Sequence, residues 1–182
     1  MRRYMSCIST VVVLLCLMAE AAFAAPPAAG GGASWFIYGE YAHDAYMFPG
    51  AGGPAIGVGR GARGGSFGIL LQYAGNGADA WPVYGIFAGL RRAEFLLEGH
   101  LLTNGEAVFG RAAALYMIPA RRAALTAGGG LLAENKYGET WFFLEGGVRL
   151  TVAPKTFAYA ALDYTLDEYG DILIKFGISR GF

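Results

Sequence analysis

The stretch Asp171-Ile-Leu-Ile-Lys-Phe-Gly-Ile-Ser-Arg-Gly-Phe182 ends the chain and decides how the rest of it is interpreted. Apolar side chains occupy every second position for most of its length, and the positions between them include Lys, Gly and Ser. Successive side chains of a strand point to opposite sides, so a period of two predicts a β-strand with one apolar and one polar face. An edge strand of a soluble sandwich shows the same alternation, so the pattern leaves the surroundings of the strand open.

The last residue of this strand is aromatic: Phe182 follows Phe176 and Ile178 on the same face. This ending resembles the closing strand of bacterial outer-membrane β-barrels, in which a C-terminal Phe serves as an assembly signal. The resemblance implies that Phe182, Phe176 and Ile178 form the signal read by the barrel-assembly machinery. Arg180 departs from the family pattern, which has an aromatic or apolar residue at that place. A long Arg side chain near a membrane interface can reach the headgroups.

The N-terminus has the features of a secretory signal peptide. Arg2 and Arg3 precede an apolar run over residues 8–18, and Ala22-Phe23-Ala24 matches the small-x-small cleavage pattern. The apolar run is shorter than the about 20 residues that a membrane-spanning helix needs. The expected organisation is a signal peptide over residues 1–24, a flexible lead-in over residues 25–33, and one β-barrel domain over residues 34–182.

Both cysteines, Cys7 and Cys16, lie in the segment that we expect to be removed. An exported domain of this size without disulfides must be stabilised in another way. Closure of a barrel within a bilayer is one such way, because every backbone group then finds a partner and no strand edge remains. Without Arg2, Arg3 and Glu20, 12 basic and 13 acidic residues remain of the 14 and 14 in the full chain. This balance gives no reason to expect a nucleic-acid partner.

Short alternating runs separated by turn residues recur from residue 34 to the end of the chain. Glycine is abundant, with 29 residues, 14% of the chain is aromatic, and no later apolar run approaches the length of a spanning helix. Tilted membrane strands of about 9–11 residues are typical of such a composition. The expected strands are 34–42, 55–62, 66–74, 83–91, 93–102, 107–117, 123–132, 141–151, 157–166 and 171–182.

The sequence therefore predicts an all-β fold: a closed, antiparallel, up-and-down transmembrane β-barrel of about ten strands. Eight strands is the alternative, if the Gly-rich runs near Ala55 and Ala123 are not strands. Charge supports the count of ten, because the connections sort into a basic and an acidic class, and their charge is independent of the strand alternation. Connections after even-numbered strands carry Arg63, Arg91, Arg92, Arg121, Arg122 and Lys155; those after odd-numbered strands carry Asp44, Asp79, Glu106, Glu134, Glu139, Asp167, Glu168 and Asp171.

Charged residues fall on the faces opposite the apolar ones, where a membrane barrel has its lumen. The Asn104-Gly105 turn signal, taken as a two-residue type I′ hairpin, places Glu98 opposite Arg111. Centring the last loop near Tyr169 places Asp163 opposite Lys175, and both are expected lumen charge pairs. The inward-facing polar residues are expected to be Glu40, Gln72, Glu94, Glu98, His100, Arg111, Glu145, Arg149, Asp163 and Lys175.

Taken together, the signal peptide, the strands and the terminal Phe resemble the small outer-membrane barrels of the OmpX and OmpW kind. The resemblance implies a bacterial outer-membrane location, with outer-membrane lipid and the barrel-assembly machinery as partners and a monomeric chain. A narrow lumen filled by side chains argues against a wide pore. The expected function is a structural or surface-interaction role, or a narrow channel for small solutes. Tyr46, Met47 and Phe48 would form an apolar extracellular loop tip that contacts lipid or a partner. A small solute or a host surface ligand is a further expected partner.

Two other classes of protein are alternatives to this interpretation. An outer-membrane lipid-modifying enzyme would need a His with a neighbouring nucleophile or acid, and His43 and His100 show no such arrangement. The sequence shows no cofactor motif, no metal-ligand cluster and no catalytic set, so no enzyme is expected. A soluble periplasmic barrel that binds an apolar ligand is the other alternative.

Overall fold

The structure is a computed structural model that describes residues 34–44, 53–62, 64–74, 81–136, 138–166 and 170–182. Among these residues, no helix is long and apolar enough to cross a membrane. The expected signal peptide, the lead-in and the loop tip Tyr46, Met47 and Phe48 lie outside the described residues. The strands are β1 (Ser34–Asp44), β2 (Gly53–Ala62), β3 (Gly65–Ala74), β4 (Trp81–Arg92), β5 (Phe95–Thr103), β6 (Val108–Ala120), β7 (Ala123–Glu134), β8 (Glu139–Ala153), β9 (Thr156–Thr165) and β10 (Ile172–Gly181).

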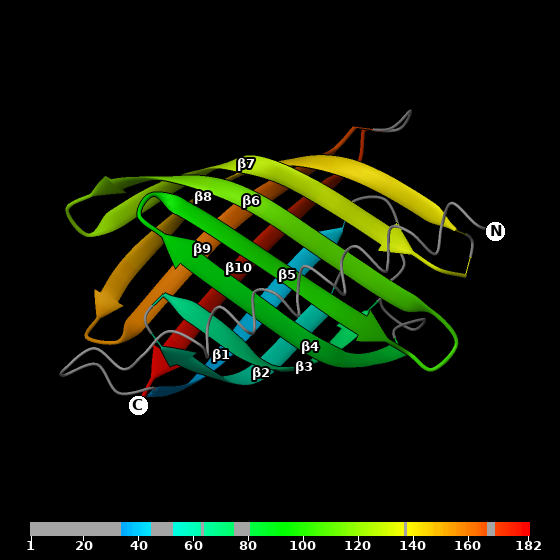
Figure 1. Ribbon diagram of the computed structural model, residues 1–182, viewed down its shortest axis with the longest axis horizontal. Helices are drawn as coiled ribbons and strands as arrows, with labels where there is room; N and C mark the ends of the chain where they lie inside the picture. The colour runs from blue at the N-terminus through cyan, green and yellow to red at the C-terminus, as the bar shows by residue number, and fades with distance from the viewer. Residues whose placement is uncertain (1–33, 45–52, 63, 75–80, 137, 167–169) are drawn as a thin grey trace.

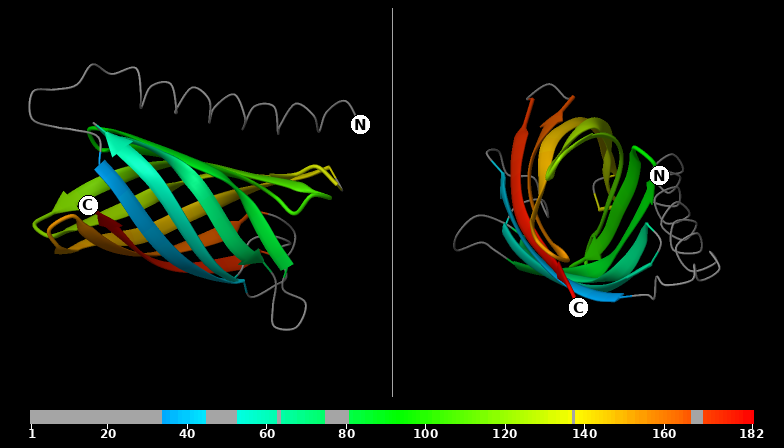
Figure 2. Two further views of the ribbon diagram at one scale, coloured as in Figure 1. Left: turned by 90° about the horizontal axis from the view of Figure 1, so that it is seen from below. Right: turned by 90° about the vertical axis from the view of Figure 1, so that its left-hand side faces the viewer.

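These ten strands form a closed barrel in which each strand pairs antiparallel with its neighbours in sequence (Figure 1). The last strand returns to the first, and β1 pairs with β10 through nine residue pairs that begin at Phe36 and Gly181. The view along the barrel shows the strands as one tilted ring (Figure 2). The expected ten-strand up-and-down barrel is confirmed, and the eight-strand alternative is wrong.

The two ends of the barrel differ in their connections and in their charge. Two residues join each even-numbered strand to the next, whereas the connections after odd-numbered strands are longer. Ala93 and Lys155 adopt positive φ angles of 51° and 58° in two of the short turns, as two-residue hairpins require. The short turns and their flanks hold Arg91, Arg92, Arg121, Arg122 and Lys155, and this end is called here the basic end. The opposite end, called the acidic end, holds Glu106, Glu134 and Glu139.

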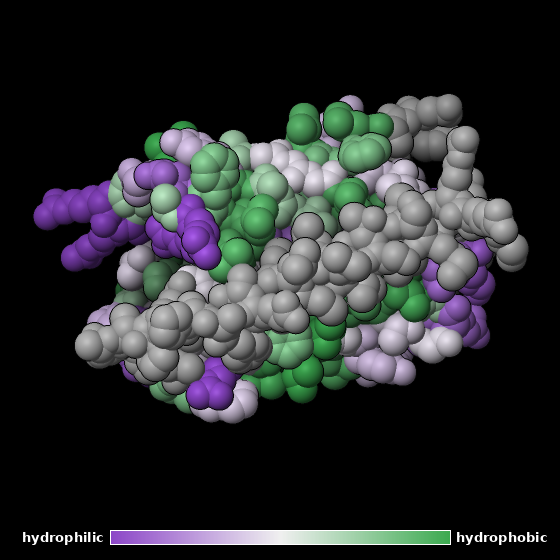
Figure 3. Space-filling view, viewed as in Figure 1, coloured by the Kyte–Doolittle hydropathy of each residue, from purple (hydrophilic) through white to green (hydrophobic). Residues whose placement is uncertain are grey.

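Side-chain polarity is inverted relative to a soluble barrel. Large apolar side chains point outward from every strand, and Ile56 and Phe142 are each 61% exposed. Figure 3 shows hydrophobic residues across the middle of the visible barrel surface and hydrophilic residues towards its ends. Charged side chains are instead buried inside, with Asp163 only 2% exposed. A surface of this kind is stable only where the surroundings of the barrel are apolar.

Glycines on the inward faces of the Gly-rich strands make room for aromatic rings of other strands. A Cβ placed on Gly57 would lie 2.1 Å from the Tyr38 ring, and one on Gly59 would lie 2.8 Å from the rings of both Phe36 and Phe87. On β7, a Cβ at Gly130 would meet the Phe143 ring at 2.8 Å. Each glycine therefore leaves room for an aromatic ring inside a narrow barrel.

The interior has an apolar side as well as a polar one. On the apolar side, Leu70, Val83, Phe87 and Leu102 are buried together. The Phe87 ring packs edge-on against the Tyr38 ring, with centroids 5.0 Å apart. The interior is thus polar over only part of its wall.

Candidate functional site

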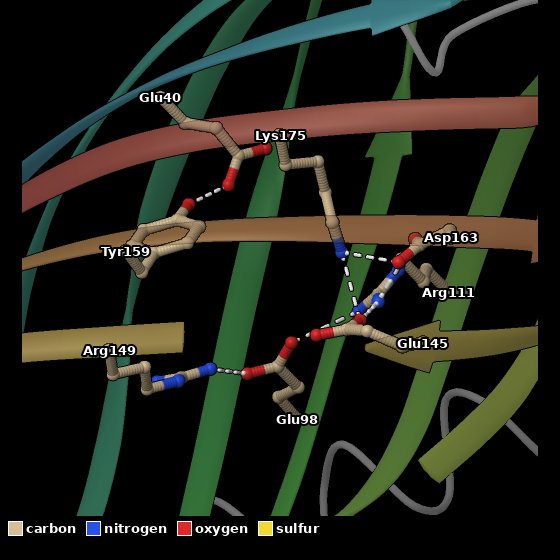
Figure 4. Close-up of polar contacts among 8 residues, drawn as sticks. All are labelled: Glu40, Glu98, Arg111, Glu145, Arg149, Tyr159, Asp163 and Lys175. Carbon is tan, nitrogen blue, oxygen red and sulfur yellow. Dashed lines mark hydrogen bonds and ion pairs between the residues drawn. The ribbon is translucent and has the colours of Figure 1, made fainter. Parts of the chain in front are cut away.

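An ion-pair network crosses the polar side of the interior and is the candidate functional site (Figure 4). Its side chains come from six strands, and all of them occupy positions that alternate with the outward apolar residues. The members are Glu40 on β1, Glu98 on β5, Arg111 on β6, Glu145 and Arg149 on β8, Tyr159 and Asp163 on β9, and Lys175 on β10.

Arg111 is the centre of this network. Its Nη1 lies 3.2 Å from Glu98 Oε1, and its Nη2 lies 3.3 Å from Asp163 Oδ2. The same Nη2 also donates to Glu145 Oε2. The guanidinium lies over the Phe143 ring, 4.6 Å from the centroid, so one face contacts an aromatic ring while its edge contacts carboxylates. One buried cation therefore joins carboxylates on three strands.

Lys175 closes the network from the other side. Its Nζ lies 2.9 Å from Glu145 Oε2 and 3.0 Å from Asp163 Oδ1. Glu145 and Asp163 are each bridged by both Arg111 and Lys175, which makes a four-membered ring of alternating charge. The side chains of Glu145 and Asp163 are only 2% exposed, and that of Lys175 is 8% exposed. This ring is the most buried part of the network.

Towards the basic end of the barrel the network continues through Glu98, whose Oε2 accepts a hydrogen bond from Arg149 Nη2 at 2.8 Å. The Arg149 guanidinium lies 5.7 Å from the centroid of the Tyr159 ring. The Tyr159 hydroxyl in turn donates to Glu40 Oε2. Three cations and three carboxylates are thus joined directly by ion pairs, and a tyrosine adds Glu40 beside them.

Charge balance and burial determine what this network contributes. Taking charges out of water is costly, so a buried network is stable only when its charges are balanced and its groups hydrogen-bonded. Removal of one member leaves an uncompensated charge, which costs roughly 3–5 kcal/mol where the group is desolvated. The network therefore ties together strands that are not neighbours, and it lines the polar side of the interior.

The structure corrects the predicted register of both charge pairs. Arg111 lies directly opposite His100, and Glu98 lies opposite Ala113. Asp163 lies opposite Leu173, and Lys175 lies opposite Ala161. Each prediction was wrong by two residues, which preserves the face, so both pairs still form as diagonal contacts.

The other predicted residues are placed as follows. Glu145 and Arg149 share the inner face of β8 but contact different partners. The inward placement predicted for Glu94 was wrong: β5 begins only at Phe95, so Glu94 lies exposed in the β4–β5 turn. Phe176, Ile178 and Phe182 point outward at 54%, 53% and 63% exposure. The Phe182 amide donates to the Trp35 carbonyl at 2.9 Å, which fastens the end of the chain across the β1–β10 seam.

Two residues that contact the ion-pair network were not predicted from the sequence. Tyr159 was missed, although it lies four residues before Asp163 and strand alternation alone puts both on one face. Phe143 is 1% exposed and lies beneath the Arg111 guanidinium. It also shares a face with Glu145, so the signal was present in the alternation of β8.

A cavity of about 920 Å³ lies inside the barrel, lined on one part by the network residues Glu98, Arg111 and Arg149. Its lining also includes Arg91, Arg121, Arg122 and Lys155 at the basic end. His100 faces this interior, and His43 is exposed on β1. Among the described residues no group of three or more His, Cys, Asp or Glu could hold a metal ion.

Comparison with known proteins gives the following. No family model matches the chain, and no curated protein matches it. Among solved structures, the outer membrane protein Ail of Yersinia pestis in a phospholipid bilayer nanodisc is similar, with 15% identity and a TM-score of 0.39 over 83% of this chain and 100% of Ail. Ail in complex with the heparin analogue sucrose octasulfate has 17% identity and a TM-score of 0.29 over 84% and 99%. A loop-deletion mutant of OmpT, an outer membrane protein of Vibrio cholerae, has 15% identity and a TM-score of 0.32 over 80% of this chain and 62% of OmpT.

Proposed function

We propose that this chain is an integral outer-membrane β-barrel protein without enzymatic activity, in which the interior ion-pair network closes the lumen to solutes. Its role is then structural or at the cell surface. The observation that carries the proposal is that apolar side chains point outward while Arg111, Glu145, Asp163 and Lys175 are buried inside. Only an apolar environment outside the barrel makes this distribution favourable.

Orientation follows from the connections. Outer-membrane barrels have short periplasmic turns and longer extracellular loops. The two-residue turns, together with Ser34 and Phe182, then lie on the periplasmic side, and the acidic end with Glu106, Glu134 and Glu139 faces outward. A cleaved signal peptide ending at Ala24 would deliver the chain to this membrane, and intact mass of the exported protein tests that cleavage.

The closure of the lumen rests on how the network is built. Carboxylates of β5, β8 and β9 meet cations of β6 and β10 within hydrogen-bond distance, so the contacts reach across the interior and not merely along one wall. The cavity of about 920 Å³ is the observation that favours the second candidate, a narrow channel for small solutes. The two candidates differ in conductance.

Single-channel recording of the refolded protein in planar bilayers separates the two candidates. The unaltered barrel is expected to conduct weakly, and Arg111→Ala is expected to raise the ion conductance several-fold because it removes the residue at the centre of the network. Lys136→Ala is the matched control, because Lys136 pairs with Glu106 at an exposed site, with Nζ and Oε2 3.1 Å apart. A conductance typical of an open pore in the unaltered protein, unchanged by Arg111→Ala, would contradict closure by the network. Recovery in the soluble periplasmic fraction would contradict the membrane assignment itself.

A further inference from the structure

A second feature of the interior is the mouth of the cavity at the basic end. The right-hand view of Figure 2 shows the barrel from that end. Four exposed cations line the mouth: Arg91, Arg121, Arg122 and Lys155, a set called here the basic mouth. They come from three different turns, so the fold assembles the basic mouth from distant parts of the sequence. No ion pair engages these four cations within the part of the chain that the structure describes.

The wall just inside the basic mouth is apolar. Phe36, Leu96, Met117 and Phe157 line the cavity there, and each lies within a few residues of the end of its own strand on this side of the barrel. Phe157 is 48% exposed although it occupies an inward position, because the cavity opens beside it. Farther in, the Glu98–Arg149 pair and the Tyr159–Glu40 contact bound this part of the cavity.

We propose that this part of the cavity binds a single-chain anionic amphiphile, an alkyl carboxylate, with its headgroup at the basic mouth and its alkyl chain against the apolar wall. Charge complementarity selects the headgroup, since the lining cations at the mouth lack acidic partners among the described residues, and Glu94 of the neighbouring turn does not line the cavity. The apolar wall selects the tail. The whole cavity, which also extends to Glu134 and Trp141 at the opposite end of the barrel, has a volume of about 920 Å³, within the about 300–1,000 Å³ of small-molecule sites.

The site is separate from the closure of the lumen, because the amphiphile enters from the end and need not cross the ion-pair network. A barrel that conducts ions can still bind at the basic mouth, and a closed barrel can fail to bind. Conductance and amphiphile binding therefore test the two proposals independently.

The experiment is a calorimetric titration of decanoate into the full-chain barrel in nanodiscs of zwitterionic phosphatidylcholine, with empty nanodiscs to subtract partition into lipid. Decanoate is expected to bind the barrel saturably, and acetate is not. Nonyltrimethylammonium, with an equal nine-carbon alkyl chain and the opposite charge, is expected to bind at least tenfold more weakly. Shortening the chain to octanoate removes two CH₂ groups and should weaken binding roughly tenfold.

Variants locate the site. Arg121→Gln with Arg122→Gln should weaken decanoate binding at least tenfold, whereas the matched pair Arg92→Gln with Arg180→Gln should change it less than twofold, because those exposed cations do not line the cavity. Phe157→Ser should weaken decanoate more than it weakens octanoate. A heat-dependent gel shift confirms that each variant is folded. The proposal is overturned if decanoate binds no better than to empty nanodiscs, if the two Arg pairs have equal effects, or if chain length has none.

Discussion

Arg111 and Glu98 contact each other diagonally across the β5–β6 pair, with Nη1 and Oε1 3.2 Å apart, while the residue directly opposite Arg111 is His100. Both partners are shared, since Arg111 also contacts Glu145 and Asp163, and Glu98 also contacts Arg149. The energetic unit is therefore the network and not the pair. This changes what a substitution at either residue is expected to do.

Arg111→Leu should lower the free energy of unfolding by roughly 3–5 kcal/mol if the site is desolvated, because it leaves three carboxylates with two cations. Adding Glu145→Gln restores the balance, since Arg149 then still pairs with Glu98 and Lys175 with Asp163. The double variant should be more stable than Arg111→Leu, as measured by denaturant unfolding in detergent. As a control, Lys136→Met at the exposed pair with Glu106 should cost less than about 1 kcal/mol. A double variant no more stable than the single one would mean that the charges do not act as one network.

Gly57→Ala should destabilise the barrel by about 1–3 kcal/mol, because its Cβ would overlap the Tyr38 ring on the adjacent strand. Gly39→Ala is the matched control, since its Cβ would have no neighbour nearer than the Ala55 carbonyl oxygen at 3.9 Å. That control should be neutral or slightly stabilising. Combining Gly57→Ala with Tyr38→Leu should recover part of the loss by freeing the space. Equal effects of Gly57→Ala and Gly39→Ala on the denaturation midpoint would count against this packing.

Leu144→Arg should destabilise the barrel in a lipid bilayer by roughly 2–4 kcal/mol, because Leu144 points outward near the middle of β8. Val152→Arg, outward at the end of the same strand that carries the short turns, should cost about 0–1 kcal/mol. Reversible unfolding from lipid vesicles measures both. The difference between the two positions is the informative quantity, because a barrel surrounded by water would tolerate Arg equally at either place.

Deletion of Phe182 should lower the amount of folded barrel in the outer membrane several-fold while affecting refolding in detergent only weakly. Its side chain is 63% exposed and adds little packing, so a loss confined to cells would reflect recognition during assembly. Phe95→Ala is the control, because Phe95 is 57% exposed on another strand. Heat-dependent gel shifts of membrane fractions and of refolded protein give both readings. Equal losses in cells and in detergent would assign Phe182 a purely structural role.

Strand alternation predicted the number of strands and the inward face of each charged residue in the ion-pair network, because both depend on local sequence. The register in which neighbouring strands pair was harder to predict. Asn104-Gly105 was read as a two-residue turn, but Asn104 Oδ1 accepts hydrogen bonds from the amides of Glu106 and Ala107, at 3.0 and 2.8 Å. These bonds widen the connection to four residues and shift the pairing by two.

The partners of Arg111 across the barrel could not be deduced from the sequence in the same way. Glu145 and Asp163 belong to β8 and β9, neither of which neighbours β6. Hairpin geometry relates only adjacent strands, so contacts across the interior depend on the curvature that closure imposes. The apolar side of the interior was missed for the same reason, since the Phe87 ring of β4 packs against the Tyr38 ring of β1, and these two strands are not neighbours.

The pairing of Phe36 with Gly181 has a consequence for the speed of folding. It joins two residues separated by nearly the whole chain, and the entropic cost of such a loop is met before the contact stabilises anything. Until this seam forms, β1 and β10 are open edges able to pair with other chains. We therefore expect closure of the seam to limit the folding rate, and an unfinished or truncated chain to aggregate rather than persist as a smaller barrel.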